Sequence, residues 1–294
     1  MKCTRLGLSY WLVAGLYLAS CSSKPTEGAN SDEFKKAEKS LSEQIEEVIY
    51  NIPSPTEIPY LLEATGADFN PSLVNNRKKA DQYAAVSDKA ALNLGVYAAD
   101  IGYLASYDKT QDAIDHMNAC KTLADNLGII GAFDLDVLSK FETNITNKDS
   151  LATLLNSTIN QADKYLRNDK RNKLAALILT GSFVEGLYIS TGLVKSYPRD
   201  LLPDDQRNLI LTPLMRIILE QEKSVDELLQ MLSNAGLEDP IPNIISDLTS
   251  LQASYRALNI EEQIKNNRAD LVLTDKNLAE ITATVEKLRG SITR

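Results

Sequence analysis

Two acidic residues lie near the middle of long apolar segments, where charged side chains are uncommon. Asp100 is the only charged residue of the segment Ala90–Tyr107, and Glu185 is the only charged residue of the segment Leu174–Val194. An unpaired charge inside a protein costs several kcal/mol, so each acid needs a partner or must keep its proton. A carboxyl group in such surroundings is suited to acid–base chemistry or to binding a ligand in a polar pocket. The alternative is a hydrogen-bonded core acid that fixes how the helices pack.

Tyrosines accompany both acids at helical spacing. Tyr97 and Tyr103 lie three residues before and after Asp100, and Tyr188 lies three residues after Glu185. Residues three apart share a helix face, so phenol groups would lie beside each acid. We expect both acids to be buried and hydrogen-bonded, each to at least one tyrosine or basic partner. In the alternative interpretation, these five side chains are candidates for a ligand-binding pocket between the two core helices. In a less favoured reading, the two acids serve as the acid–base pair of a hydrolase or lyase.

A third set of reactive side chains lies on one helix face. Asp112, His116 and Cys120 follow one another at intervals of four residues, and His116 is the only histidine of the chain. Such residues can bind zinc. Three positions along a straight helix nevertheless span about 12 Å and cannot all reach one ion. Cys120 also continues an apolar stripe, so we expect neither a metal site nor a cofactor here.

Sequence motifs of the common enzyme classes are missing. There is no G-x-S-x-G, no P-loop, no H-E-x-x-H and no Rossmann glycine pattern. A serine triad would require His116 to meet a serine from a distant part of the chain. The sequence therefore favours a binding or scaffolding protein over an enzyme, and we assign no catalytic residue.

The N-terminus has the layout of a bacterial export signal. Lys2 and Arg5 precede the apolar run Leu6–Leu18, which is too short to span a bilayer. The residues Leu18-Ala19-Ser20-Cys21 resemble the lipobox of bacterial lipoproteins. This resemblance implies that residues 1–20 are removed, that the thiol of Cys21 carries diacylglycerol, and that its amine is acylated. Several acyl chains give stable membrane anchoring.

The segment after the signal and the charge of the chain both fit an envelope location. Residues 21–30 are polar with proline and glycine, which is typical of a flexible tether. Ser22 is not the aspartate that retains lipoproteins in the inner membrane of some bacteria, so we expect the outer membrane, facing the periplasm. The net charge of −9 argues against nucleic acid as a partner. The expected partners are the membrane, through the lipid, and an envelope protein or a small ligand.

Residues 31–294 indicate a single all-helical domain. Apolar residues recur at spacings of three and four, and no alternating Val/Ile/Thr runs indicate strands. The expected helices cover residues 31–52, 54–65, 87–107, 108–127, 133–145, 150–167, 171–197, 204–234, 243–266 and 275–288. We predict an irregular antiparallel bundle or array of about eight to ten helices, with a solenoid as the alternative. Pro198 and Pro203 mark a point at which the domain could subdivide.

Local signals make finer predictions about these helices. Each core helix carries a stripe of small residues, which would let helix backbones approach closely: Gly95, Ala99 and Gly102 on the first, and Ser182, Gly186 and Ser190 on the second. Asp108 and Gln111 would cap the helix that Gly128 ends. Pro213 predicts a kink or an earlier start in the segment 204–234.

Three short segments resemble a known family: Leu94–Asp100 (LGVYAAD), Lys121–Gly128 (KTLADNLG) and Glu185–Tyr188 (EGLY). Together they are similar to a family of helical lipoproteins of Bacteroidota-type bacteria, over most of the chain that follows the signal. The resemblance implies a helical fold and a location in the cell envelope, and it implies no activity.

Overall fold

The computed structural model describes residues 68–129, 171–197, 218–236, 238–258 and 275–294, with isolated helical residues between Lys39 and Gln161. Every regular element in these ranges is a helix, which confirms the all-α prediction. The signal sequence, Cys21, the tether and the two proline positions Pro198 and Pro203 lie outside the described residues. So do the predicted helices at 31–52, 54–65, 133–145 and 150–167, apart from isolated positions.

The described ranges contain seven α-helices and two short 3-10 helices, where about eight to ten helices were predicted for the whole domain. In chain order they are η1 (Pro71–Leu73), η2 (Arg77–Lys79), α3 (Ala80–Ala84), α4 (Ser87–Ser106), α5 (Thr110–Asn126), α8 (Asn172–Ser196), α10 (Glu222–Ala235), α11 (Ile241–Ala257) and α14 (Asp275–Ile292).

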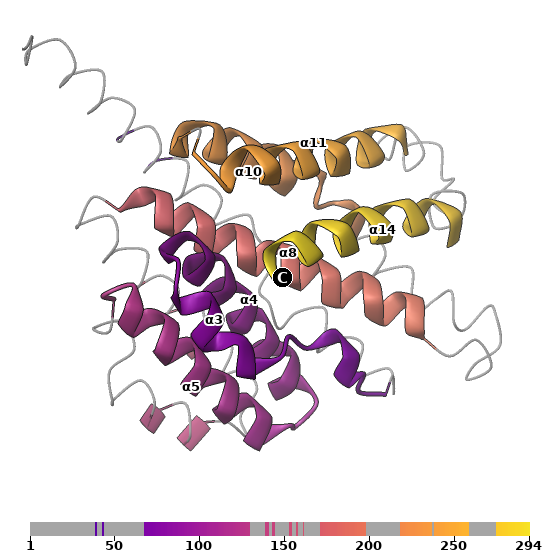
Figure 1. Ribbon diagram of the computed structural model, residues 1–294. Helices are drawn as coiled ribbons and strands as arrows, with labels where there is room; N and C mark the ends of the chain where they lie inside the picture. The colour runs from indigo at the N-terminus through magenta and orange to yellow at the C-terminus, as the bar shows by residue number, and fades with distance from the viewer. Residues whose placement is uncertain are drawn as a thin grey trace, which may run out of the picture.

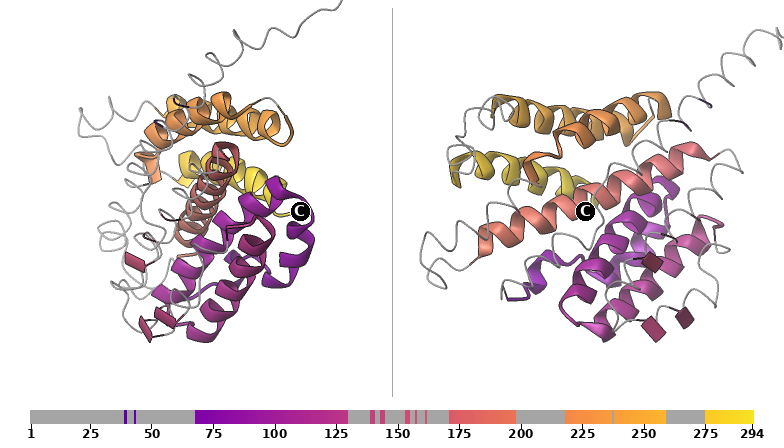
Figure 2. Two further views of the ribbon diagram at one scale, coloured as in Figure 1. Left: turned by 90° about the vertical axis from the view of Figure 1, so that its left-hand side faces the viewer. Right: turned by 180° about the vertical axis from the view of Figure 1, so that it is seen from behind.

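Helix α8 is the centre of this arrangement. It packs on α4 on one side and on α14 and α10 on the other, and it separates two layers (Figures 1 and 2). One layer holds α4 with α5 and the short α3, and the other holds α14 with the α10–α11 pair. Among the helices that the structure describes, α8 alone is long and apolar enough to cross a membrane by length and composition. Most of its apolar stretch is buried inside the protein, as in a core helix.

The helices differ in how much of their surface is covered, as their sequences predict. Helices α4 and α8 are apolar on nearly every side and are buried almost throughout. Helix α14 is amphipathic, and its predicted stripe faces the core: Leu278, Ile281, Val285 and Leu288. Charged residues on the other faces of α10, α11 and α14 remain partly or fully exposed.

The α4–α8 contact depends on two glycines. A Cβ atom on Gly95 would lie 2.0 Å from the carbonyl oxygen of Ile178, and one on Gly181 would lie 1.9 Å from that of Leu92. Only glycine lets the two backbones come this close. The prediction that small residues bring these helices together is therefore right for Gly95, but wrong for Gly186. A Cβ atom at Gly186 would meet nothing within 4 Å, and Gly181 makes the contact instead.

Helix boundaries agree closely with the sequence for α4, α5 and α8, and differ elsewhere. The predicted helix 204–234 is interrupted by a turn at Glu220–Gln221, so α10 begins only at Glu222; residues 198–217, with Pro213, are outside the described part. Helix α14 continues to Ile292, beyond the predicted end at 288. Residues 68–86, where no helix was predicted, hold the short elements η1, η2 and α3.

The ends of α5 show one wrong and one right prediction. Its N-terminal flanking residue is Lys109, whose side chain makes no capping bond, whereas Asp108 has φ 55° and terminates the preceding turn. Gly128, as predicted, ends the helix with φ 67°, a conformation that favours glycine. Its N–H donates to the carbonyl oxygen of Asp125 at 3.1 Å.

Candidate functional site

The two core acids meet where α4, α8 and α14 converge. Asp100 and Glu185 each have 0% of their surface exposed, which confirms their predicted burial. Arg289 of α14 holds Glu185 with two hydrogen bonds: Nε donates to Oε2 at 2.9 Å, and Nη2 donates to Oε1 at 2.9 Å. This two-point geometry is the strong form of the arginine–carboxylate pair. Glu185 therefore has a basic partner, as predicted, and this partner comes from α14, just beyond the predicted end of that helix at 288.

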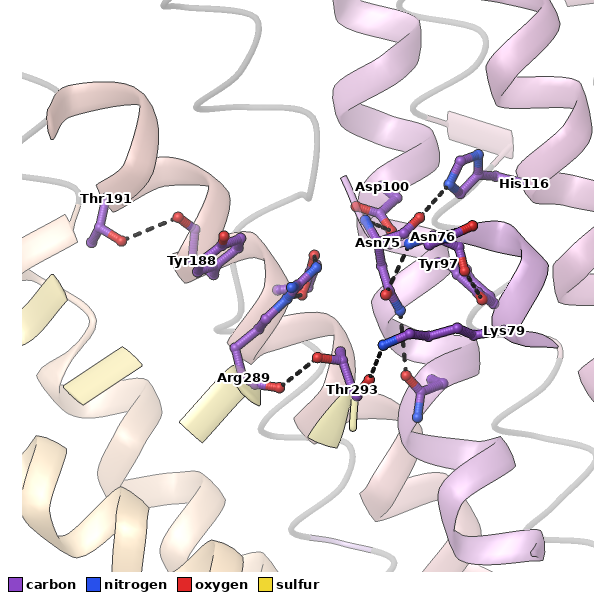
Figure 3. A network of polar contacts seen from close by, with 12 residues as sticks. Asn75, Asn76, Lys79, Tyr97, Asp100, His116, Tyr188, Thr191, Arg289 and Thr293 are labelled. Carbon is purple, nitrogen blue, oxygen red and sulfur yellow. Dashed lines mark hydrogen bonds and ion pairs between the residues drawn. The ribbon is translucent and has the colours of Figure 1, made fainter. Parts of the chain in front are cut away.

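Tyr188 contributes its ring face to this ion pair. The guanidinium carbon of Arg289 lies 4.5 Å from the centre of the Tyr188 ring, and Figure 3 shows the two side chains adjacent to each other. A guanidinium over an aromatic face gains a cation–π interaction. Only 16% of the Arg289 side chain is exposed. The predicted proximity of Tyr188 to Glu185 is thus correct, but the tyrosine orients the arginine and donates no hydrogen bond to the acid.

Asp100 is held differently. Its Oδ2 accepts the backbone N–H of Asn75 at 3.1 Å, and its Oδ1 is buried with no donor from another residue in reach. The side chain of Glu185 is within hydrogen-bonding range of the Asp100 carboxyl. Asp100 thus has neither the tyrosine nor the basic partner that its position predicted, and its neighbour is a second acid.

Tyr97 and Tyr103 hydrogen-bond the loop that precedes α3 instead of Asp100. The Tyr97 hydroxyl donates to the carbonyl oxygen of Asn76 at 3.0 Å, and the Tyr103 hydroxyl donates to that of Asn70 at 3.2 Å. The N–H of Asn70 donates back to Tyr103 at 2.8 Å. Burial raises the pKa of Tyr103 to about 12 and raises that of Tyr97 as well, so both phenols stay protonated donors.

The C-terminal turn of α14 is bound to the same region. The carbonyl oxygen of Thr293 accepts from Lys79 Nζ at 2.8 Å (Figure 3). It also accepts from the Tyr83 hydroxyl at 2.8 Å. The carbonyl oxygen of Ile292 accepts from Asn93 Nδ2 at 3.1 Å. The last carbonyls of a helix lack partners within it, and side chains of η2, α3 and α4 supply them here. These residues carry no motif, and the sequence analysis missed them.

His116 holds the loop in place, and no metal geometry surrounds it. Its Nδ1 lies 2.8 Å from the carbonyl oxygen of Asp112, and its Nε2 lies 3.0 Å from that of Asn75. The Asp112 carboxylate binds Arg77 at 3.3 Å, and Cys120 is buried, which raises the pKa of its thiol. Within the described ranges, no three His, Cys, Asp or Glu residues are grouped so that they could hold a metal ion.

The electrostatics of the centre differ between the two acids. Burial raises the pKa of Asp100 well above its usual range, the Glu185 charge raises it further, and Arg289 opposes both effects. Burial also raises the pKa of Glu185, against the lowering influence of Arg289. Burial lowers the pKa of Arg289, but the adjacent Glu185 carboxylate outweighs this, so the net shift is upward. Of the two acids, Asp100 is therefore the one whose ionised form is less stabilised by its surroundings.

The arrangement joins three helices and is poorly suited to turning over a substrate. Neither carboxyl exposes any surface, and both oxygens of Glu185 are already bonded to Arg289. A substrate would reach the acids only if the helices separated. Of the five predicted pocket residues, Asp100, Glu185 and Tyr188 lie around Arg289, while Tyr97 and Tyr103 bind the loop.

Comparison with known proteins adds no assignment to this geometry. The chain matches no protein-family model, no curated protein and no solved structure. The resemblance to helical lipoproteins of Bacteroidota-type bacteria stays a prediction from the sequence.

Proposed function

We propose that this protein is a lipid-anchored scaffold of the bacterial cell envelope, which binds a partner through its surface and carries out no catalysis. The observation that supports this role is the contact between Glu185 and Arg289. An acid that serves a substrate needs an open face, whereas Glu185 uses both oxygens to bind its own chain at zero exposure. The charged centre then serves to hold an irregular antiparallel helical bundle together.

The anchor in this proposal is Cys21, which follows the lipobox residues Leu18-Ala19-Ser20. After cleavage, the acylated cysteine would hold the protein on the outer membrane, and residues 21–30 would serve as a tether. The domain of residues 31–294 would then face the periplasm. An envelope protein is the partner that best suits this location, because the acidic chain is not adapted to nucleic acid.

A small-ligand-binding role is the second candidate, and one observation favours it. Asp100 Oδ1 is buried and receives no donor from another residue. A ligand with an N–H or O–H group would satisfy this oxygen, provided that the loop around Asn75 or helix α14 moved to admit it. Thermal-shift screening with envelope metabolites tests this role, because a ligand that binds only the folded state raises the melting temperature.

Removal of the anchor tests the main proposal. Cys21→Ser should yield an unprocessed or soluble protein, because the lipid is the strong membrane signal in the sequence. Membrane fractionation of cells that express wild type or variant measures this. Wild type should fractionate with the outer membrane and release only with detergent. A processed Cys21→Ser protein that stays membrane-bound at high salt would contradict lipid anchoring.

The partner itself can be sought by chemical cross-linking in intact cells, with Cys21→Ser as the matched control for location. A scaffold should give a discrete cross-linked product that depends on Cys21. Turnover of an envelope substrate by purified residues 22–294, abolished by Glu185→Gln, would overturn the non-catalytic role.

A further inference from the structure

The contact between Asp100 and Glu185 joins two groups that are both acceptors when ionised. We propose that this pair binds one proton, carried on Oδ1 of Asp100 and donated to Glu185, and that the proton is a structural ligand that fastens α4 to the α8–α14 unit. This inference concerns the interior of the protein and is independent of the envelope role proposed above.

The inventory of donors around the pair leads to this assignment. Oδ2 of Asp100 accepts from Asn75, and each oxygen of Glu185 accepts from Arg289. Asp100 is 0% exposed, and its Oδ1 atom is buried without a hydrogen-bond donor in reach. As a carboxylate oxygen it would be a buried acceptor left unpaired beside a second carboxylate, which is unfavourable on both counts. As an O–H group it becomes the donor, and Glu185 has lone pairs left to accept from it.

Charge balance leads to the same result. The other titratable or charged groups that face the pair or its loop partner Asn75 come from every neighbouring element: Arg289 from α14, Tyr188 from α8, Tyr97 from α4, Tyr83 from α3, Lys79 from η2, and His116 and Cys120 from α5. Of these, Arg289 is the cation bonded to the pair, while Lys79 is directed to the carbonyl oxygen of Thr293 and His116 to those of Asp112 and Asn75. One cation balances one carboxylate, so the second acid is best neutral.

The two acids are not equivalent as carriers of the proton. Arg289 grips Glu185 at two points and stabilises its ionised form. Asp100 has only one backbone N–H. The directions of the pKa shifts agree with this choice, because burial and the Glu185 charge both favour the neutral form of Asp100.

The proton makes stability depend on pH in a defined direction. The pKa of Asp100 is raised in the folded state, so the folded protein holds this proton over a pH range in which the unfolded chain has lost it. Over that range the free energy of unfolding falls as pH rises. The contribution is complete below the ordinary aspartate pKa and is lost as pH rises through the raised folded value. Loss of the proton would place a second charge beside Glu185 and loosen α4 from α14.

Two near-isosteric substitutions test the position of the proton. Asp100→Asn keeps an acceptor for Asn75 and supplies a permanent N–H donor to Glu185. Its melting temperature should match wild type near about pH 4 and exceed it increasingly toward about pH 9. Glu185→Gln should melt far below wild type throughout, because an amide cannot accept from both nitrogens of Arg289 and leaves the cation unbalanced.

Infrared spectroscopy gives a second readout that survives if Glu185→Gln fails to fold. Wild type at neutral pH should show the C=O band of a protonated carboxylic acid, and Asp100→Asn should lack it. Asp247→Asn is the matched control. Asp247 of α11 is 13% exposed and binds Lys287 at 2.8 Å, and Lys287 lies on α14, the helix that also carries Arg289. That variant should keep both the band and the pH slope.

Three results would overturn the proposal. One is an Asp100→Asn protein that melts as low as Glu185→Gln, which would show that Asp100 is needed as an anion. The second is a carboxylic acid band that persists in Asp100→Asn. The third is a pH slope in Asp100→Asn equal to that of wild type.

Discussion

The two faces of α8 are held by opposite kinds of contact. Toward α4, Gly95 and Gly181 let the backbones come close, and shape decides the fit at this crossing. Toward α14, Arg289 binds Glu185, and charge decides the fit. A contact based on shape tolerates no added atom but is indifferent to charge. A contact based on a buried ion pair tolerates some changes of shape but fails when one charge is removed.

The comparison also explains why one face is easier to recognise than the other. The α4–α8 contact is encoded by apolar runs and glycines that belong to the two helices themselves. The α8–α14 contact requires Glu185 and Arg289, which are 104 positions apart, and the sequence around either residue does not indicate that the other is its partner. The first contact is therefore visible in local sequence, whereas the second emerges from the fold.

The largest effect is expected on the charged face. Glu185→Leu should lower the free energy of unfolding by about 3–5 kcal/mol, because it leaves the Arg289 guanidinium buried without its partner. Denaturant unfolding measures this loss. Adding Arg289→Met to the same chain should recover part of the stability, since no unpaired charge then remains. A double variant no more stable than Glu185→Leu would mean that the ion pair is not what makes the acid necessary.

On the glycine face, a single methyl group should have the next largest effect. Gly95→Ala should cost about 3 kcal/mol, at the upper end of the overpacking range, because backbone atoms of α8 stand where the Cβ must go. Gly186→Ala is the control on the same pair of helices. Its Cβ meets nothing, and alanine should gain up to about 1 kcal/mol from helix propensity. Equal melting temperatures for the two variants would disprove the close crossing.

The smallest effect is expected at the rim of the charged face. Lys195 of α8 binds Glu286 of α14 at 2.9 Å, with side chains 63% and 44% exposed. Lys195→Ala should change stability by no more than about 1 kcal/mol, because water screens such pairs. The change should shrink further in high salt. A loss as large as that of Glu185→Leu would mean that burial does not separate the two ion pairs on this face.

Much of the fold was predictable because its signals are local. Apolar runs place α4 and α8, Gly128 ends α5, and the isolation of Asp100 and Glu185 in those runs predicts their burial. Arg289 was missed because it lies one residue beyond the predicted end of the last helix, at 288, whereas α14 continues to Ile292. One signal was available: Arg289 follows Val285 by four residues and precedes Ile292 by three, so it lies in the buried stripe of α14.

Other differences come from tertiary contacts that no local pattern contains. The helix expected over 204–234 is interrupted at Glu220–Gln221, where the carbonyl oxygen of Ile218 accepts the Tyr255 hydroxyl at 2.8 Å. Tyr97 and Tyr103 were expected to bind Asp100, but their hydroxyls donate to the carbonyl oxygens of Asn76 and Asn70 instead. Asp100 accepts from the N–H of Asn75 in the same loop. An irregular loop has no periodic pattern, so the sequence does not predict which side chains will hydrogen-bond to it.

The bond between Tyr83 and the carbonyl oxygen of Thr293 also bears on the order in which the chain folds. The two residues are 210 positions apart, and Asn93 and Ile292 are separated by 199. Contacts across such distances carry a large loop-closure entropy and slow the folding transition. As the chain is synthesised, α3 and α4 emerge long before α14. Until α14 is present, Tyr83 and Asn93 have water as their hydrogen-bond partner in place of its C-terminal carbonyl oxygens. Those side chains of α3 and α4 therefore reach their final hydrogen bonding only after α14 has been synthesised.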